Sequence, residues 1–450
     1  MINRLESEPI SKLLIEYSIP AILGMVVTVM YSVVDTMFIG HRLGTESLAG
    51  VAMVFPLSRV SNSISVLISA GGGVLISIAL GEKNKDKVRK ILGNQIFLTL
   101  TLCLVVIVGQ VLFLPYFLKG HGNNLKMVEE AISYGRVFLF CSFFNTITLS
   151  FNNAIRAQGY PKLVLLTAVA SSLTNIVLDY IFIFPLNLGV TGAAIASLIA
   201  SILPLWMIAY FMSKNNGLMR IKLKDLKFDF KIIKNILKLG AATAIIPFAN
   251  GALIGIFNMK LIVLGGTTAV AVYGIYMTIH SVVLMISSGI SAGVQPIISH
   301  NLGAEKYFRV SEAIKIAVKS GTLISLGIFF LIQLFPGLII KSFITDSETI
   351  ELGIEALRYG FILAPVMIMT IMISGVYRAM GDARRAFIYN FLRKVIIIFP
   401  IIFILPNILG MRGVWLSRPI SDLIALTIML PALLKTIKKL NSKVEISTLT

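Results

Sequence analysis

Twelve apolar stretches, each about as long as a membrane-spanning helix, dominate this sequence of 450 residues. A helix needs roughly 20 apolar residues to cross the hydrocarbon core of a bilayer, and the polar segments between the stretches are too short to form a soluble domain. The sequence therefore predicts an all-α integral membrane protein. The twelve predicted spans, numbered in chain order, are residues 13–39, 48–80, 91–117, 129–155, 163–184, 190–212, 236–264, 268–300, 311–335, 352–377, 386–406 and 413–434.

The positive charge of the chain is distributed unevenly between the two sides of these spans. Only 14% of residues are charged, against roughly a quarter in soluble proteins, and the net charge is +19. The loops on the side of the termini carry 25 Lys and Arg, whereas the opposite loops carry 5. The positive-inside rule therefore predicts cytoplasmic termini in a multi-pass protein of the cell (inner or plasma) membrane. It also explains the basic composition without nucleic acid as a partner.

The two halves of the sequence repeat one another. The motif Arg-Ala-x-Gly begins at Arg156 and again at Arg378, and Leu80-Gly81 recurs as Leu302-Gly303 with the same offset. Because each half holds six spans, an even number, both halves cross the membrane in the same direction. We predict an N-lobe at 1–212, a basic cytoplasmic linker at 213–235 and a C-lobe at 236–450, with the substrate route between the lobes.

Several sequence motifs occur at corresponding places in the spans. They are Val34-Asp35-Thr36-Met37-Phe38-Ile39-Gly40, Gly293-Val294-Gln295-Pro296-Ile297 with Asn301-Leu302-Gly303-Ala304, the two Arg-Ala-x-Gly sequences, and Gly189-x-x-Gly192-Ala193-Ala194. With these motifs, in this order, the chain resembles the multidrug and toxic compound extrusion (MATE) family over nearly its whole length. It is most similar to the branch that includes the DNA-damage-inducible F proteins.

The resemblance implies two pseudo-symmetric six-helix lobes and an antiporter, not an enzyme. Such an antiporter exports amphipathic, cationic drug-like compounds by alternating access in exchange for H+ or Na+. The sequence has no GxxxxGK[ST] phosphate-binding loop, so ATP is not expected to drive transport from within this chain. We expect no cofactor beyond the coupling ion, small amphipathic substrates and membrane lipid as partners, and a monomeric protein.

Polar residues at one predicted depth of the N-lobe suggest a site for the coupling ion. Asp35 lies near the outer end of span 1, Asn175 and Asp179 near that of span 5, and Ser197 in span 6. Ionisable residues inside a membrane are costly and are functional candidates. Two carboxylates that face one dry space repel, so one of them holds a proton or is neutralised by Na+. The oxygens of Asp35, Asn175 and Asp179 would bind Na+, with Ser197 completing the shell. The family resemblance implies the same site.

A structural interpretation of the same carboxylates stays open at this point. Asp35 could close a helix end, and Asp179 could pair with Arg59 of span 2. An ion pair with Arg59 would favour the charged carboxylate and weaken proton coupling. At the positions that the repeat makes equivalent to Asp35 and Asp179, the C-lobe carries Phe257 and Ile401. We therefore predict that coupling resides in the N-lobe alone.

A second group of polar residues marks a possible substrate cavity. These residues are Arg59, Lys260, His280, Gln295 and Arg418. Cations that faced the cavity would repel a cationic drug. An exporter or flippase of anionic amphiphiles or lipid-linked saccharides is therefore the alternative function.

Each C-lobe cation also has a purely structural interpretation. Arg418 could pair with Asp422 one turn later, and Lys260 could extend its ammonium to the membrane surface. Arg393 and Lys394 of span 11 could reach the cytoplasmic headgroups. Only the arrangement of the side chains distinguishes these possibilities.

Overall fold

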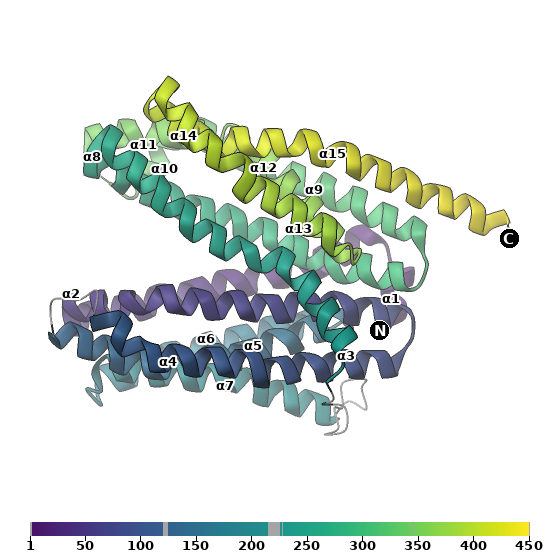
Figure 1. Cartoon of the computed structure of the whole chain (residues 1–450), viewed down its shortest axis with the longest axis horizontal. Coiled ribbons are helices and arrows are strands. Elements are labelled where there is room, and N and C mark those ends of the chain that lie inside the picture. Colours follow the sequence, from purple (N-terminus) through teal and green to yellow (C-terminus); the bar gives the residue numbers. More distant parts are fainter. Residues whose placement is uncertain (1, 120–124, 215–225, 227, 345, 450) are drawn as a thin grey trace. The chain divides into compact units, whose positions relative to one another are not determined.

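The computed structural model of the chain describes residues 2–119, 125–214, 226, 228–344 and 346–449, and every regular element in them is a helix (Figure 1). The helices are α1 (Ile2–Ser7), α2 (Ile10–Gly81), α3 (Lys85–Leu98), η1 (Thr99–Cys103), α4 (Leu104–Lys119), α5 (Leu125–Ala157), α6 (Pro161–Ile183), α7 (Gly189–Lys214), α8 (Phe230–Gly303), α9 (Tyr307–Leu334), α10 (Pro336–Lys341), α11 (Ser347–Gly360), α12 (Ala364–Ala379), α13 (Ala383–Phe391), η3 (Leu392–Ile397), α14 (Ile398–Leu409) and α15 (Met411–Leu449). The labels η1 and η3 denote π-helical turns.

The predicted membrane spans are present as helices. Within the described residues, 10 helical segments are long and apolar enough to cross a bilayer, and α11 with α12, bent by 48°, forms an eleventh. One of these segments is α8, whose 74 residues are far too many for one crossing. Non-helical backbone at Gly265 and Gly266 divides it in two, as Gly44 divides α2. The all-α, twelve-span membrane fold is therefore confirmed.

The backbone repeats with the same period as the sequence. Apart from Asn187, the described residues with positive φ occur in pairs that are separated by the offset of the sequence repeat, or by one position less. Gly44 and Gly266 are one such pair, and glycine adopts this conformation without the steric penalty that a Cβ brings. The others are Lys83 with Glu305, Gly159 with Gly381, and Gly189 with Gly410. Equivalent turns in both halves indicate that the repeat is present in the structure as well as in the sequence.

The chain divides into two compact units whose limits differ from the predicted lobes. Unit 1 contains Leu23–Ala244 with the residues before Leu5, and unit 2 contains Leu5–Ile22 and Ile245–Thr450. The predicted linker does not form the division, and its residues 215–225 and 227 lie outside the described part of the chain. The units divide instead inside α2 and α8, at points that are equivalent in the repeat. Each unit thus includes the first part of a span from the opposite half of the sequence.

Glycine allows each exchanged segment to pack closely within its unit. In unit 1, a Cβ on Gly71 of α2 would overlap the carbonyl oxygen of Ile236 in α8. In unit 2, at equivalent positions of the repeat, a Cβ on Gly293 of α8 would lie 2.8 Å from the backbone nitrogen of Ser18 in α2. Membrane helices approach this closely only where small residues meet. The exchange of helix segments is therefore fixed by backbone packing.

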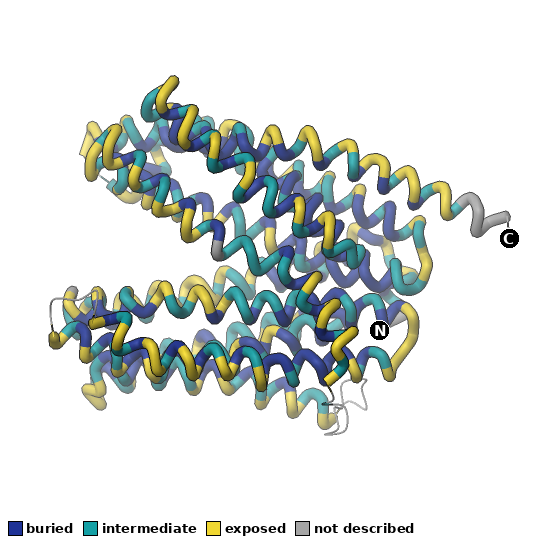
Figure 2. Tube along the Cα trace, viewed as in Figure 1, coloured by how far each residue is buried: buried dark blue, intermediate teal, exposed yellow. Residues whose placement is uncertain are grey.

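The helices expose many large apolar side chains. Leu173 and Val177 on α6, and Trp206 and Tyr210 on α7, are examples. Buried and exposed residues alternate along most helices (Figure 2). A soluble monomer rarely exposes contiguous apolar surface of this extent. These faces are suited to contact with lipid.

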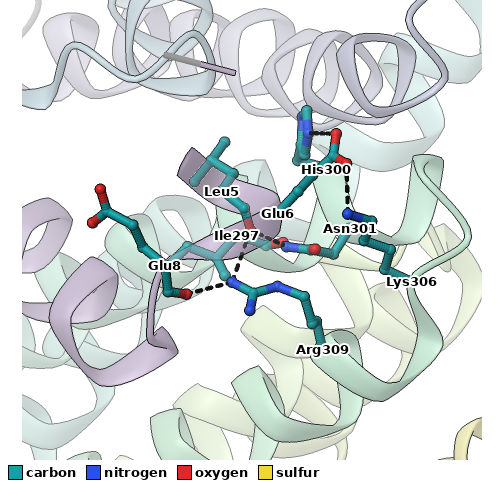
Figure 3. A network of polar contacts seen from close by, with 8 residues as sticks. All are labelled: Leu5, Glu6, Glu8, Ile297, His300, Asn301, Lys306 and Arg309. Atoms are coloured by element: carbon teal, nitrogen blue, oxygen red, sulfur yellow. Dashed lines mark hydrogen bonds and ion pairs between the residues drawn. The ribbon is translucent and has the colours of Figure 1, made fainter. Parts of the chain in front are cut away.

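Charged side chains anchor the end of α1 and Glu8, which follows it, within unit 2 (Figure 3). The carboxylate of Glu6 forms an ion pair with Lys306, with Oε2 and Nζ 2.7 Å apart. The guanidinium of Arg309 donates to the carbonyl oxygens of Leu5, at 3.0 Å, and of Glu8, at 2.6 Å. These contacts join the end of α1 and the residue before α2 to Lys306, which directly precedes α9, and to α9 itself.

Replacing Glu6 with glutamine should lower the thermal stability of the protein at neutral pH. The hydrogen bond from Lys306 holds the pKa of the Glu6 carboxyl below its usual 4.5. An acid with a lowered pKa stabilises the fold above its usual pKa, and this contribution is lost as pH falls through the folded-state value. We expect Glu6→Gln to cost about 1–2 kcal/mol and to remove this acid-dependent part of the stability. Thermal unfolding in detergent, at neutral pH and on acidification, measures both effects.

Glu82 provides a matched control for this substitution. Its carboxylate also lies 2.7 Å from a lysine ammonium, that of Lys87, but the Glu82 side chain is 35% exposed against 12% for Glu6. Exposed ion pairs contribute little because water and salt screen them. Equal losses in Glu82→Gln and Glu6→Gln would contradict a specific role for the Glu6 contacts.

Candidate functional site in unit 1

The four residues predicted to form the coupling site lie together in unit 1. The carboxyl groups of Asp35, on α2, and Asp179, on α6, are in direct contact. Asp179 is fully buried, and Asn175 lies one turn before it on the same helix. The amide nitrogen of Asn175 donates to the hydroxyl of Ser197, on α7, over 3.2 Å. Three helices therefore contribute oxygen atoms to one small region.

Several oxygens of this cluster lack a hydrogen-bond donor. No described amide, hydroxyl or charged nitrogen donates to Oδ1 of Asp35, to Oδ1 of Asn175 or to either carboxyl oxygen of Asp179. An uncompensated buried carboxylate is strongly unfavourable. Two carboxyl groups in contact can form a hydrogen bond only when one of them keeps its proton. Chemically, the cluster is suited to take up a cation, either a proton or an ion that prefers oxygen ligands.

The described residues supply no ligand set for a transition metal at this cluster or elsewhere. No three His, Cys, Asp or Glu side chains are grouped among them as such a site requires. The cluster instead combines two carboxyls with a carboxamide and a hydroxyl.

Arg59 does not neutralise the carboxyl pair. Its side chain is exposed on α2, and none of the ion pairs described for the chain connects it with Asp179. The alternative prediction of an Asp179–Arg59 ion pair is therefore not realised. The negative charge of the pair has no basic side chain as its described counter-ion.

A cavity of about 370 Å³ lies beside this cluster, within unit 1. Tyr31, one turn before Asp35, contributes to its wall, as do Ser172 of α6 and Ser197 of α7. No residue that lines it carries a formal charge. A concave wall of aromatic and uncharged polar groups can accommodate the apolar body of an amphiphile and orient its polar atoms.

Residues of α5 that line this cavity were missed by the search for ionisable groups. Ser142, Asn145, Leu149 and Asn152 all face it. Their spacing of three or four residues places them on one side of a helix. A search for uncharged polar residues with helical periodicity inside the spans would have found this stripe.

The other residues predicted to form a substrate cavity are dispersed. His280 and Arg418 line a separate cavity of about 20 Å³ in unit 2. Lys260 places its ammonium 5.0 Å from the centre of the Phe403 ring, and Gln295 is buried in α8. Neither Lys260 nor Gln295, nor Arg59, lines either of these two cavities.

Three cations of the C-terminal half, Arg393, Lys394 and Arg418, have other surroundings than the structural interpretation predicts. Arg393 and Lys394 are only 5% and 8% exposed, so they are buried within unit 2 and do not extend to its surface. Asp422 forms its ion pair with Arg393, at 3.4 Å, and not with Arg418. Arg418 donates instead to the hydroxyl of Tyr273, at 3.1 Å. These contacts join residues that are far apart in the sequence.

Comparison with known proteins is consistent with this fold. The family model MatE matches residues 20–181 and again residues 244–404. The chain is 27% identical over 435 residues to the multidrug export protein MepA of Staphylococcus aureus, with 94% of each chain covered. It is 28% identical over 422 residues to MepA of Staphylococcus haemolyticus, with 93% of this chain and 92% of that one covered.

The solved structures agree with the sequence comparisons. A MATE transporter crystallised in a bent conformation superimposes with a TM-score of 0.91 at 25% identity, and the alignment covers 98% of both chains. The family model accounts for both halves of the sequence and for well over half of its residues. The chain belongs to the MATE family, and it is a membrane transporter rather than an enzyme.

Proposed function

We propose that this chain is a secondary antiporter that exports cationic, drug-like amphiphiles by alternating access in exchange for H+ or Na+. The family and the multidrug export proteins among its relatives support the class of substrate. The motif around Asp35, with Asn175 and Asp179, supports the branch that includes the DNA-damage-inducible F proteins.

The contact between Asp35 and Asp179 beside an uncharged cavity is the observation that carries this proposal. The pair needs a positive charge to compensate it, and H+, Na+ or a cationic substrate could each supply that charge. Because the ion and the cationic substrate compete to compensate the negative charge of the carboxyl pair, uptake of the ion would favour release of the substrate. A ligand shifts a conformational equilibrium only through its different affinities for the two states. Exchange follows if the pair binds its ion more tightly in one state than in the other.

The loop charges support a cytoplasmic location for both termini. The basic segments of the terminus side include the five Lys and Arg between Gly81 and Lys90. Such clusters contact the anionic cytoplasmic leaflet. In this orientation, the carboxyl pair would lie toward the outer end of the first span of α2, which ends at Gly44, and toward the outer end of α6.

Transport of anionic amphiphiles or lipid-linked saccharides is the second candidate. The buried cations Arg393, Lys394 and Arg418 favour it, because they place positive charge inside unit 2. They surround only the smaller cavity, whereas the cavity of about 370 Å³ has uncharged walls. We therefore prefer cationic substrates.

Transport by the purified protein in lipid vesicles tests both candidates. The internal solution would contain ethidium, a cationic amphiphile, or a fluorescent anionic amphiphile, under an imposed pH or Na+ gradient. We expect one of the two ion gradients to accelerate movement of ethidium and not of the anion. Acceleration of neither probe by either gradient would refute antiport, and acceleration of the anion alone would favour the second candidate.

A further inference from the structure

We propose that unit 2 binds a small monovalent inorganic anion of the chloride class between Arg393, Lys394 and Arg418. These three side chains line the cavity of about 20 Å³, and each is more than nine-tenths buried. They come from η3 and α15, and Asp422 of α15 lies in the same wall. This site is separate from the carboxyl pair of unit 1.

The charges around the cavity do not balance. The wall contains three cationic side chains and one carboxylate, that of Asp422. Apart from His280, its other residues are apolar or uncharged. Burial of an uncompensated charge is strongly unfavourable. An anion in the cavity would supply part of the missing negative charge.

Arg393 forms an ion pair with Asp422, which carries the only carboxylate of this wall. Its Nη1 donates to Oδ1 of Asp422, at 3.4 Å, and to the hydroxyl of Thr370, at 2.9 Å. Ser421 donates its hydroxyl to the carbonyl oxygen of Arg393, at 3.2 Å, so this hydroxyl also has a partner within the protein. The contacts fix Arg393 in place and leave the other two cations of the wall without a described ion pair.

Arg418 has partners, but none of those described is an anion. Its Nη2 donates to the hydroxyl of Tyr273, and its guanidinium lies 4.9 Å from the centre of the Phe257 ring. Its Nε is buried and has no hydrogen-bond acceptor among the described residues. Phe257 stands where the repeat places Asp35 in the other half. The aromatic contact therefore compensates the cation only in part.

Lys394 is the least compensated group. Its side chain is only 8% exposed, and no ion pair or hydrogen bond is described for its ammonium. Nδ1 of His280, in the same wall, also has no described partner. An ammonium, a guanidinium and an imidazole N–H all donate, so together they form a site for an acceptor.

The size of the cavity determines the class of anion. Its volume of about 20 Å³ has room for one particle of about the size of water. A halide ion fits such a space, whereas phosphate, sulfate and the head group of an amphiphile are too large. Leu253, Leu284 and Ile398 make the rest of the wall apolar, which favours a weakly hydrated halide.

Replacement of chloride by gluconate tests for the ion in the full-length protein. Thermal unfolding in detergent would be followed at constant ionic strength as chloride replaces gluconate, which is too large for the cavity. We expect a saturable increase in unfolding temperature, because a ligand that binds only the folded state stabilises it. The same unfolding temperature in both salts, across the whole titration, would overturn the proposal.

Lys394→Met provides the decisive variant. It keeps an unbranched side chain of similar length and removes the charge, so the protein should fold without the anion. We expect the chloride concentration that gives half of the maximal stabilisation to rise at least tenfold. In gluconate, the variant should unfold at a higher temperature than the wild type. Lys319→Met is the matched control, because Lys319 is exposed on α9 of the same unit and lines neither cavity. Equal chloride dependence in wild type and Lys394→Met would contradict the assignment.

Bromide gives a direct measurement that does not depend on any variant. Crystals grown in bromide should show an anomalous peak between Arg393, Lys394 and Arg418, and a map without a peak there would refute the site. Asp179→Asn should retain the chloride response even where it stops transport. Failure of the anion site and failure of the proposed antiport are therefore distinguishable.

Discussion

Asp179→Asn should reduce gradient-driven export to the level of passive leak. The substitution keeps the side-chain volume but removes the group that takes up the ion, so the ion can no longer favour one conformation. Coupling free energies between sites correspond to factors on the order of 5- to 150-fold, and we expect a loss of transport rate in this range. Substrate efflux from vesicles under the effective ion gradient is the measurement.

The same variant should remain folded. Asp179 is buried without a described basic partner, and an asparagine there could donate a hydrogen bond to Asp35. Removing an uncompensated buried charge is often neutral or stabilising. Asp86→Asn is the control, because Asp86 is an exposed carboxylate of α3, 85% accessible, with only a long contact to Arg89. A stable Asp179→Asn protein with full gradient-driven export would refute the role of the carboxyl pair.

Gly240→Ala should strongly destabilise unit 1. A Cβ on Gly240 of α8 would overlap the carbonyl oxygen of Leu67 in α2. Because the obstructing atom belongs to the backbone, no change of rotamer relieves the overlap, and the two helices must separate. Overpacking usually costs about 1–3 kcal/mol, and a backbone clash is expected at the upper end of this range or above it. Unfolding temperature and the yield of monodisperse protein in detergent report the effect.

Gly251→Ala is the corresponding control on the same helix. No other described atom lies within 4 Å of a Cβ built on Gly251, so alanine there adds helix propensity without a clash. We expect it to be neutral or to stabilise the protein by about 0.5–1 kcal/mol. If Gly240→Ala were as stable as Gly251→Ala, close packing at Gly240 would not hold the exchanged segment of α8 in unit 1.

The candidate coupling site was predictable because its signal is local. Asp35 and Asp179 stand out as acidic residues in apolar spans, and the period of the helix places Asn175 beside Asp179. The uncharged stripe of α5 was missed because Ser and Asn are common in membrane helices and only their periodicity distinguishes them. The partner of Asp422 was not predictable from spacing, since Arg393 and Arg418 compete for it and only their positions decide between them.

The sequence by itself determined the number of spans, the distribution of loop charge and the repeat of the two halves, because hydropathy and charge act along short segments of chain. Tertiary structure alone decided that the first parts of spans 1 and 7 belong to the opposite units. It also brought Arg393, Lys394 and Arg418 to one small cavity. The physical reason is that these features depend on close contacts between distant segments. Neither the backbone approach at Gly71 and Gly240 nor the convergence of buried charges leaves a periodic pattern in the sequence.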